Sequence, residues 1–299
     1  MESFQTLKKS LKGKLIFGEP LSRHTTFCIG GPAKIWAEPS SEDDLRKLIT
    51  FAKRLGLKFV VLGAGSNILA SDKGFEGLIL MMSSPQFSNL EIKKNQLKAG
   101  AGAKLARCVY SACKHSLSGM EGLFGIPGTV GGAIIMNSGY KTSIGKIVKR
   151  LRVMDRNGKI LTLKSKDLKF VYRKSNVCRY IILEAEFALK LGNEKDLRKE
   201  CVRLRQLRKD TQPWDKPSAG CVFRNPKGRC ESASSLIEKC GLKGRVFGGA
   251  KISNVHSNFI INNKSASSKD VASLMKLVKN SVMKKFNIAL KSEIIKIGS

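Results

Sequence analysis

The chain has 299 residues, of which 42% are hydrophobic and 26% are charged, a composition typical of a soluble globular protein. It carries 55 Lys and Arg against 23 Asp and Glu, which gives a formal net charge of +32 at pH 7. No apolar run is long enough to span a membrane, and the first twenty residues do not resemble a signal peptide, so we expect a cytoplasmic protein.

The first predicted subdomain covers residues 1–82. An extended segment is expected at 33–39, and Ser41 is a favourable N-cap because three acidic residues follow it in the first helical turn. Apolar residues then recur at helical spacing as far as Leu55, and Gly56 ends the helix. Two further strands are predicted, a short buried one at 58–63 and another at 77–82.

The second predicted subdomain covers residues 83–192. Two short strands flank a turn at 93–95, and the segment 103–115 has the apolar spacing of an amphipathic helix. A glycine-rich stretch follows at 119–140. We then predict a hairpin at 149–163 with Asn157 and Gly158 at its turn, and a strand at 180–190.

The third predicted domain covers residues 193–299 and begins with a very basic helix at 194–210. A short helix around Leu236, a strand at 258–263 and a helix with apolar residues from Val271 to Val282 follow. The closing segment 288–298 is predicted to be a strand. These elements indicate the α+β class, with two N-terminal subdomains and one C-terminal domain.

The cysteines and histidines do not suggest a metal site. None of the eight cysteines belongs to a CxxC pair, and the three histidines are scattered along the chain. In a reducing compartment we expect most of the cysteines to be buried free thiols, with Cys108 and Cys113 in the core.

Two glycine-rich segments have the composition of phosphate-binding loops. VLGAGSNIL (61–69) follows a predicted strand, and its glycines let backbone amides approach an anion while Ser66 and Asn67 add side-chain donors. It lacks the G-x-G-x-x-G pattern of a Rossmann site, and a plain tight turn explains it equally well. In GIPGTVGGA (125–133), Thr129 could start a short helix directed at a phosphate; close packing of a buried segment is the alternative. Together the two segments suggest a dinucleotide between them.

Six segments come in the order and spacing of the UDP-N-acetylenolpyruvoylglucosamine reductase (MurB) family: HTTFCIGGPA, VLGAGSN, GIPGTVGGAIIMNSG, YRKS, SAGCVFRNP and KSEIIKIG. The resemblance extends from residue 21 to residue 298. It implies two N-terminal FAD-binding subdomains of the vanillyl-alcohol oxidase/PCMH-type fold and a C-terminal α+β substrate-binding domain. The chain is similar to the shorter type of the family, which lacks an extra tyrosine-bearing loop over the substrate.

The resemblance also implies the reaction. In this family NADPH reduces a bound FAD, and hydride then passes to UDP-N-acetylglucosamine enolpyruvate to give UDP-N-acetylmuramate, a precursor of peptidoglycan. We expect the FAD to be held without a covalent bond, since neither glycine segment offers a histidine or cysteine. By position, the residues expected to line the FAD are Gly63, Ala64, Gly65, Ser66, Asn67, Ile126, Gly128, Thr129 and Gly132.

Three catalytic roles follow from the resemblance. Arg173 in YRKS matches the family arginine, and a guanidinium can grip the enolpyruvyl carboxylate with two hydrogen bonds. Glu293 in KSEIIKIG matches the family glutamate and is predicted to lie in a strand. Cys221 stands where most relatives have serine, and we predict that its thiol donates a proton to the substrate. Without the motifs, Arg173 would be interpreted as a surface residue and Cys221 as a small buried thiol.

Four further substrate contacts are predicted, and they are Tyr172, Lys216, Asn225 and His256. A lysine near a diphosphate is physically sensible, whereas a histidine is more often structural than a ligand.

Two other functions remain open, namely a different FAD oxidoreductase of the same fold and a basic nucleic-acid-binding protein. The lysines are spread along the chain without a long basic tract, so we favour a lysine-rich surface or attraction of an anionic substrate. We expect no nucleic-acid partner, no membrane insertion, no metal and a monomer.

Overall fold

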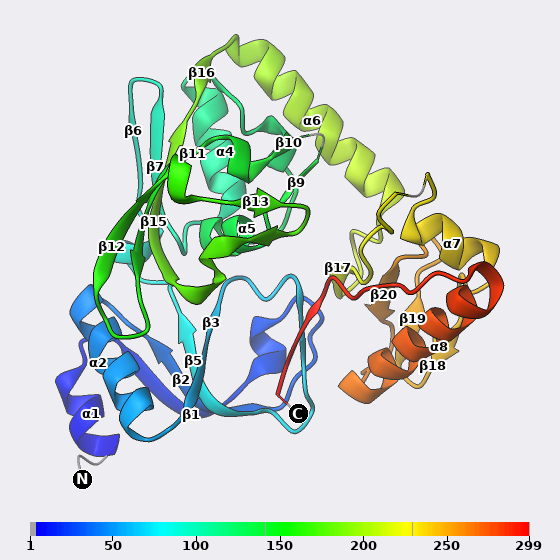
Figure 1. The fold of residues 1–299 in the computed structure, drawn as a ribbon, viewed down its shortest axis with the longest axis horizontal. Helices are drawn as coiled ribbons and strands as arrows, with labels where there is room; N and C mark the ends of the chain where they lie inside the picture. Colours follow the sequence, from blue (N-terminus) through cyan, green and yellow to red (C-terminus); the bar gives the residue numbers. More distant parts are fainter. Residues whose placement is uncertain (1–3, 141, 229, 299) are drawn as a thin grey trace. The chain divides into compact units, whose positions relative to one another are not determined.

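The computed structural model describes residues 4–140, 142–228 and 230–298, and the chain folds into two compact units (Figure 1). Unit 1 contains the chain up to Phe17, Ile35–Ala64 and Glu76–Gln206. Unit 2 contains Gly18–Lys34, Gly65–Phe75 and the chain from Leu207 onward. Both units mix helices with strands, which confirms the α+β class. The division at 82/83 and 192/193 stays a prediction.

The first sheet of unit 1 has the strand order β1-β2-β5-β3, and β3 runs parallel to β5. Of the five residues of the edge strand β3, all of them described, only Leu62 is buried. The prediction of a buried strand at 58–63 is therefore wrong, because an edge strand has a sheet neighbour on one side alone. The elements are α1 (Phe4–Ser10), β1 (Lys14–Pro20), β2 (Pro32–Glu38), α2 (Glu42–Arg54), β3 (Lys58–Leu62) and β5 (Phe75–Met81).

Two side chains fix the start of α2. Ser41 is the N-cap, as predicted, and its Oγ accepts a hydrogen bond of 3.1 Å from the Asp44 backbone N–H. The Asp44 carboxylate is buried and accepts hydrogen bonds from the backbone N–H groups of Lys12, Gly13 and Ser40 and from Ser40 Oγ. Burial alone would raise the pKa of Asp44, but these hydrogen bonds together lower it. Asp44 therefore joins the segment before β1 to the helix.

The second sheet of unit 1 is antiparallel, with the order β12-β11-β15-β7-β6. Helices α4 and α5 pack against β7 and β15 (Figure 1) and share a buried cluster with them that includes Leu97, Cys108, Val130 and Phe187. The predicted hairpin is confirmed, with Gly158 in the left-handed conformation at its turn. The elements are β6 (Leu90–Lys93), β7 (Gln96–Gly100), α4 (Leu105–Lys114), α5 (Val130–Ile135), β11 (Val148–Met154), β12 (Ile160–Lys164) and β15 (Ile181–Ala188).

Several short helices and strands lie between these elements or, for η1, in unit 2. The short helices are α3 (Pro85–Ser88), η1 (Leu21–His24), η2 (Glu121–Leu123), η3 (Ile144–Lys146), η4 (Ser165–Asp167) and η5 (Asn176–Arg179). The short strands are β8 (Leu117–Ser118), β9 (Gly139–Tyr140), β10 (Thr142–Ser143), β13 (Phe170–Val171), β14 (Lys174–Ser175) and β16 (Lys190–Leu191).

Unit 2 has an antiparallel sheet with the order β17-β20-β19-β18, and α7 and α8 pack against each other, with α8 against β18 and β19 (Figure 1). A parallel pair joins β4 to β21. The prediction of a strand over the whole of 288–298 is wrong in extent, because the partner strand β4 is three residues long. The elements are β4 (Ile68–Ala70), α6 (Glu194–Thr211, which begins in unit 1), β17 (Ser218–Cys221), α7 (Ala233–Lys239), β18 (Val246–Phe247), β19 (Ala250–Ile252), β20 (Phe259–Asn262), α8 (Ser268–Phe286) and β21 (Ile295–Ile297).

Within the described ranges, no helix combines the length and the apolar composition that crossing a bilayer requires. The same residues contain no group of three or more His, Cys, Asp or Glu side chains placed to hold a metal ion.

All eight cysteines are free thiols, but the expectation that most of them are buried is wrong. Cys108, Cys113 and Cys201 are buried, whereas three others are exposed and two are half-buried. Cys108 and Cys113 lie in the core as predicted, and burial raises the pKa of Cys108 to about 12. The half-buried pair includes Cys221, whose thiol is thus not core filler.

We predict that Asp44→Ala lowers the free energy of unfolding by about 1–3 kcal/mol, because it leaves three partly buried backbone N–H groups without their acceptor. Urea denaturation at pH 7 measures the loss. The effect should shrink in acid: the folded pKa of Asp44 is lowered, so its contribution is present above the unfolded pKa of about 3.9 and disappears as the pH falls through the folded value.

The matched control is Asp43→Ala, one residue earlier on the same helix. The Asp43 side chain is 61% exposed and forms ion pairs with Arg46 and Lys47, so its loss should change stability by less than about 1 kcal/mol. Equal effects of the two substitutions would contradict the role assigned to Asp44.

Candidate active site

Cys221 ends strand β17 at a bulge. Ser218 pairs with Ile261 and Cys221 with Phe259, so β17 has one residue more than its partner between the two pairs. Gly220 adopts a φ of 74°, which glycine reaches without strain. The small residues before Cys221 thus allow the chain to bend just where the thiol projects.

The residues after Cys221 are held on one side by Asn258. The Val222 N–H donates to the Asn258 carbonyl at 2.8 Å. The Phe223 N–H donates to Asn258 Oδ1 at 2.9 Å, and Asn258 Nδ2 donates to the Phe223 carbonyl at 2.8 Å. Asn258 is buried, and sequence reasoning missed it; its position within the predicted strand 258–263 gave no sign of this contact.

Glu293 lies on the other side of the same segment. Its backbone N–H donates to the Val222 carbonyl at 2.8 Å, Phe223 forms an isolated bridge with Ser292, and the Arg224 N–H donates to the Lys291 carbonyl at 2.9 Å. Glu293 is half-buried and lies two residues before β21 rather than within a strand. Unit 2 thus brings two of the three predicted catalytic residues onto neighbouring stretches of backbone.

Part of the first glycine segment belongs to this cluster. Asn67 Nδ2 donates to the Glu293 carbonyl at 3.2 Å, and the Ile295 N–H donates to the Asn67 carbonyl at 2.9 Å. A Cβ on Gly65 would lie 2.1 Å from the His24 carbonyl oxygen, so this position requires glycine. Gly65, Ser66 and Asn67 therefore lie in unit 2, next to the backbone that carries Glu293.

Thr26 links the glycine segment to β17 and was missed as a functional residue. Its Oγ1 donates to the Ser218 carbonyl at 2.6 Å, and its N–H donates to the Gly65 carbonyl at 3.3 Å. The motif HTTFCIGGPA contains Thr26, but nothing in the sequence states which segments it joins.

The rest of the predicted FAD-binding residues lie in unit 1, where the two glycine segments meet. A Cβ on Gly63 would lie 2.6 Å from Thr129 Oγ1. Thr129 caps α5 as predicted and accepts a hydrogen bond from the Gly132 N–H at 3.4 Å. Gly128 precedes it with a φ of 150°, and Ala64 and Gly132 are exposed. The residues present fit a dinucleotide, because the backbone at Gly63 and Gly132 carries no side chain that would hold a ligand away.

Arg173 sits in the two-residue turn between β13 and β14. It has a φ of 54°, which is uncommon for arginine, and its guanidinium carbon lies 5.4 Å from the centre of the Tyr172 ring. Asn137, which the sequence did not single out, fixes the hairpin: its Nδ2 donates to the Val171 carbonyl at 3.0 Å and its Oδ1 accepts from the Gly145 N–H. Asn137 follows α5, so the hairpin that carries Arg173 is bonded to the chain just after this helix.

Two of the other predicted substrate contacts already make hydrogen bonds within unit 2. Asn225 Oδ1 accepts a hydrogen bond of 2.9 Å from the Ala233 N–H at the start of α7. His256 Nδ1 lies 3.2 Å from the Asn258 N, and burial lowers the pKa of His256, so the neutral ring accepts this hydrogen bond at Nδ1. Contacts of Asn225 and His256 with substrate stay predictions.

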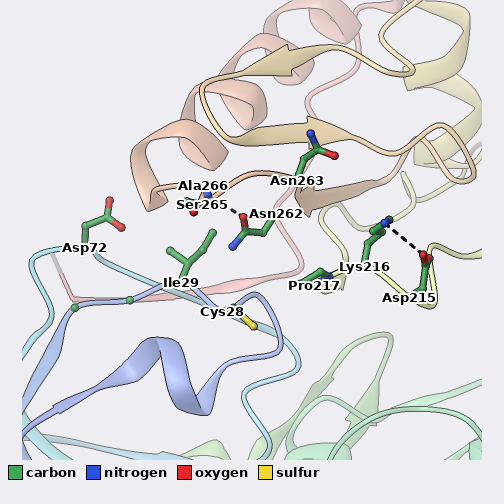
Figure 2. A pocket seen from close by; sticks show the side chains of 12 residues that line it. Cys28, Ile29, Asp72, Asp215, Lys216, Pro217, Asn262, Asn263, Ser265 and Ala266 are labelled. Atoms are coloured by element: carbon green, nitrogen blue, oxygen red, sulfur yellow. Dashed lines mark hydrogen bonds and ion pairs between the residues drawn. The ribbon is translucent and has the colours of Figure 1, made fainter.

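Lys216 lines an open cleft of about 700 Å³ in unit 2. Figure 2 shows the ion pair between Lys216 and Asp215, 3.5 Å apart, at one end of the cleft and Asp72 at the other. Among the described residues that line it, Lys216 is the only one predicted for the site. The lining is Cys28, Ile29, Gly30, Gly31, Asp72, Asp215, Lys216, Pro217, Asn262, Asn263, Ser265 and Ala266.

Comparisons with known proteins agree with this arrangement of segments. A family model for the FAD binding domain matches residues 32–164, and the model for the UDP-N-acetylenolpyruvoylglucosamine reductase C-terminal domain matches residues 212–297. The reductase of Caldanaerobacter subterraneus subsp. tengcongensis is 42% identical over 296 residues, which cover 98% of this chain and 97% of the relative.

Solved structures confirm the predicted fold. UDP-N-acetylenolpyruvylglucosamine reductase (MurB) from Thermus caldophilus aligns with a TM-score of 0.82 and 31% identity, over 96% of this chain and all of that structure. Physcomitrella patens BBE-like 1 aligns with a TM-score of 0.50 and 16% identity, over 63% of this chain and 44% of that one, which bears on the fold alone. With full-length identity above 40% and both family models matched, the chain belongs to the UDP-N-acetylenolpyruvoylglucosamine reductase family.

Proposed function

We propose that the chain is an FAD-dependent enzyme that uses NADPH to reduce UDP-N-acetylglucosamine enolpyruvate to UDP-N-acetylmuramate, a peptidoglycan precursor. Full-length similarity to reductases of that name supports the reaction. The observation that carries the proposal is the hydrogen bond from the Glu293 N–H to the Val222 carbonyl, because it sets a carboxylate residue beside the residue that follows Cys221. A cytoplasmic location and a monomeric state are part of the proposal.

The two glycine segments are the proposed binding site of FAD. When bound, FAD supplies the hydride-transfer chemistry between NADPH and the substrate. Ser66, Asn67 and Thr129 offer side-chain hydrogen bonds, while Gly63 and Gly132 keep the backbone accessible to phosphate oxygens. Ala64, Gly65, Ile126 and Gly128 complete the proposed set.

Arg173 is proposed to hold the carboxylate of the enolpyruvyl group. A guanidinium can make two parallel hydrogen bonds to a carboxylate, and its charge stabilises the negative charge that develops next to that carboxylate as the double bond is reduced. The short hairpin, fastened by Asn137, supports this role because it keeps the turn in one place. Tyr172 in the same turn is exposed and available to the substrate.

Cys221 is proposed as the proton donor. Reduction at the methylene carbon leaves carbanion character on the neighbouring carbon, which then takes a proton from an acid held at one face. A thiol has an ordinary pKa of about 8.5, so it carries its proton at neutral pH and releases it more readily than an alcohol does. Glu293 is assigned to the same step because its backbone is bonded to the residue after Cys221.

Lys216, Asn225 and His256 complete the proposed substrate contacts. Lys216 has an exposed ammonium group beside the cleft, where it can attract a diphosphate.

We predict that the FAD is held without a covalent bond, since neither glycine segment contains a histidine or a cysteine. Acid precipitation of the purified yellow protein should leave the flavin absorbance in the supernatant. Flavin absorbance retained in the washed pellet would contradict the prediction.

Arg173→Ala and Glu293→Ala should each slow the reoxidation of reduced flavin by the enolpyruvyl substrate about a hundredfold, because each removes a group that acts on the substrate. Both should leave reduction of the flavin by NADPH unchanged. Stopped-flow absorbance at the flavin band measures the two half-reactions separately.

The control is Arg179→Ala, since Arg179 likewise lies over the ring of its neighbour, Tyr180, at 5.0 Å but is assigned no role. It should leave both half-reactions at parental rates. Loss of flavin reduction by NADPH in Arg173→Ala would require a different role for Arg173.

Cys221→Ser should keep substantial activity, because a hydroxyl can also donate a proton. Cys221→Ala should lose about 10²–10⁴-fold in substrate-driven flavin reoxidation while still accepting hydride from NADPH. Cys178→Ala, which removes an exposed thiol, is the control and should behave as the parent. Activity of Cys221→Ala within a few-fold of the parent would rule out the assignment.

A further inference from the structure

The buried carboxamide of Asn258 replaces a strand neighbour for Phe223. In the ladder between β17 and β20, Cys221 pairs with Phe259, and the Val222 N–H still donates to the Asn258 carbonyl. At Phe223 the backbone partner is lost. Both polar groups of the Phe223 backbone bond instead to the side chain of Asn258, at 2.9 Å to Oδ1 and 2.8 Å from Nδ2.

Because a side chain takes the place of the β20 backbone at Phe223, the chain can change its hydrogen-bonded neighbour directly after Cys221. Beyond Val222 the segment leaves β20 and runs beside residues 291–293, where the Glu293 N–H donates to the Val222 carbonyl and Arg224 bonds to Lys291. A neighbouring strand would bond to Phe223 only by continuing the ladder beyond it. A single carboxamide supplies one donor and one acceptor, so the ladder ends at Phe223. Asn258 therefore lies where the chain that carries Cys221 stops pairing with β20 and begins to pair with residues 291–293.

Asn258 is itself held firmly. It is 3% exposed, and its backbone N–H is 3.2 Å from His256 Nδ1. Ser257, the residue between them, bonds through its Oγ to the Ser234 carbonyl in α7 at 2.9 Å. The orientation of the carboxamide is also fixed, because exchanging its oxygen and nitrogen would face donor with donor and acceptor with acceptor.

We propose that Asn258 is a positioning residue for the proton-transfer step: by bonding both polar groups of the Phe223 backbone, it fixes the position of Cys221 relative to Glu293. The inference rests on the proposed function, since it assigns those two residues to one step. Asn258 itself touches neither substrate nor cofactor in this role. A displacement of about 1 Å in a reacting group is enough to slow a positioned reaction about a hundredfold.

The primary test compares Asn258→Ala and Asn258→Asp with the FAD-loaded parent by stopped flow. Flavin reduction by NADPH should be unchanged, because it does not use Cys221. Flavin reoxidation by the enolpyruvyl substrate should fall about 10–100-fold. The solvent isotope effect on reoxidation, measured in H₂O and D₂O, should rise because proton transfer becomes the slow step.

The Asn258→Asp variant provides a rescue that a general loss of stability would not. An ionised carboxylate at this position has no donor for the Phe223 carbonyl, whereas the protonated carboxyl group again offers one donor and one acceptor. The reoxidation rate of this variant relative to the parent at the same pH should therefore rise as the pH is lowered. The Asn258→Ala variant should show no such rise.

Asp270→Ala is the control for stability within unit 2. Asp270 accepts hydrogen bonds from the N–H of Ser267, the N-cap of α8, and from the N–H of Gly249, between β18 and β19. It should lower the unfolding midpoint while leaving the isotope effect at the parental value. If the Asn258 variants match Asp270→Ala in both half-reactions and in isotope effect, the inference is wrong. If the parent itself shows no substrate-driven reoxidation, the proposed function is wrong.

Discussion

The hydrogen bond from the Glu293 N–H to the Val222 carbonyl is the contact on which the architecture of unit 2 depends. It requires that the strand bearing Cys221 leave β20, and the bulge at Gly220 and the carboxamide of Asn258 meet that requirement. It also fixes where the last strand begins, because Asn67 and Ile295 continue the same run of hydrogen bonds into the pair β4–β21. Cys221, Glu293 and part of the first glycine segment thus belong to one backbone network.

In unit 1, close packing brings Gly63 and the second glycine segment together. Gly63 approaches Thr129, and the same Thr129 caps α5, so the second glycine segment is held by a helix start rather than by side chains that would fill the space. The helix in turn leads to Asn137, which fastens the Arg173 hairpin. The hydrogen bonds of Asn137 thus connect the end of α5 to the hairpin that carries Arg173.

The net charge of the chain and the exposure of its cysteines are compatible with the proposed reaction. FAD, NADPH and a UDP-linked substrate all carry phosphates, and a net charge of +32 favours their approach at moderate ionic strength. Cysteine at position 221 is compatible with the proposed proton donation, because the residue is half-buried rather than enclosed in the core. Cys108 differs in this respect: buried among apolar side chains, with its pKa raised to about 12, it serves packing alone.

The sequence by itself determined the elements whose signals are local: the cap at Ser41, the turn at Gly158 and the order of motifs that identifies the family. The cap and the turn depend on neighbouring residues, so a pattern of a few positions suffices for them, whereas the family follows from six motifs taken in order. Only the tertiary structure revealed the hydrogen bonds of Asp44, Asn258 and Thr26. Thr26 and Ser218 lie 192 residues apart, and Asn258 bonds to a residue 35 positions away. It also shortened the closing strand, since β4 offers three residues to pair with. Such partners are chosen by the path of the whole chain, because a buried donor or acceptor bonds to whatever backbone the fold brings within reach.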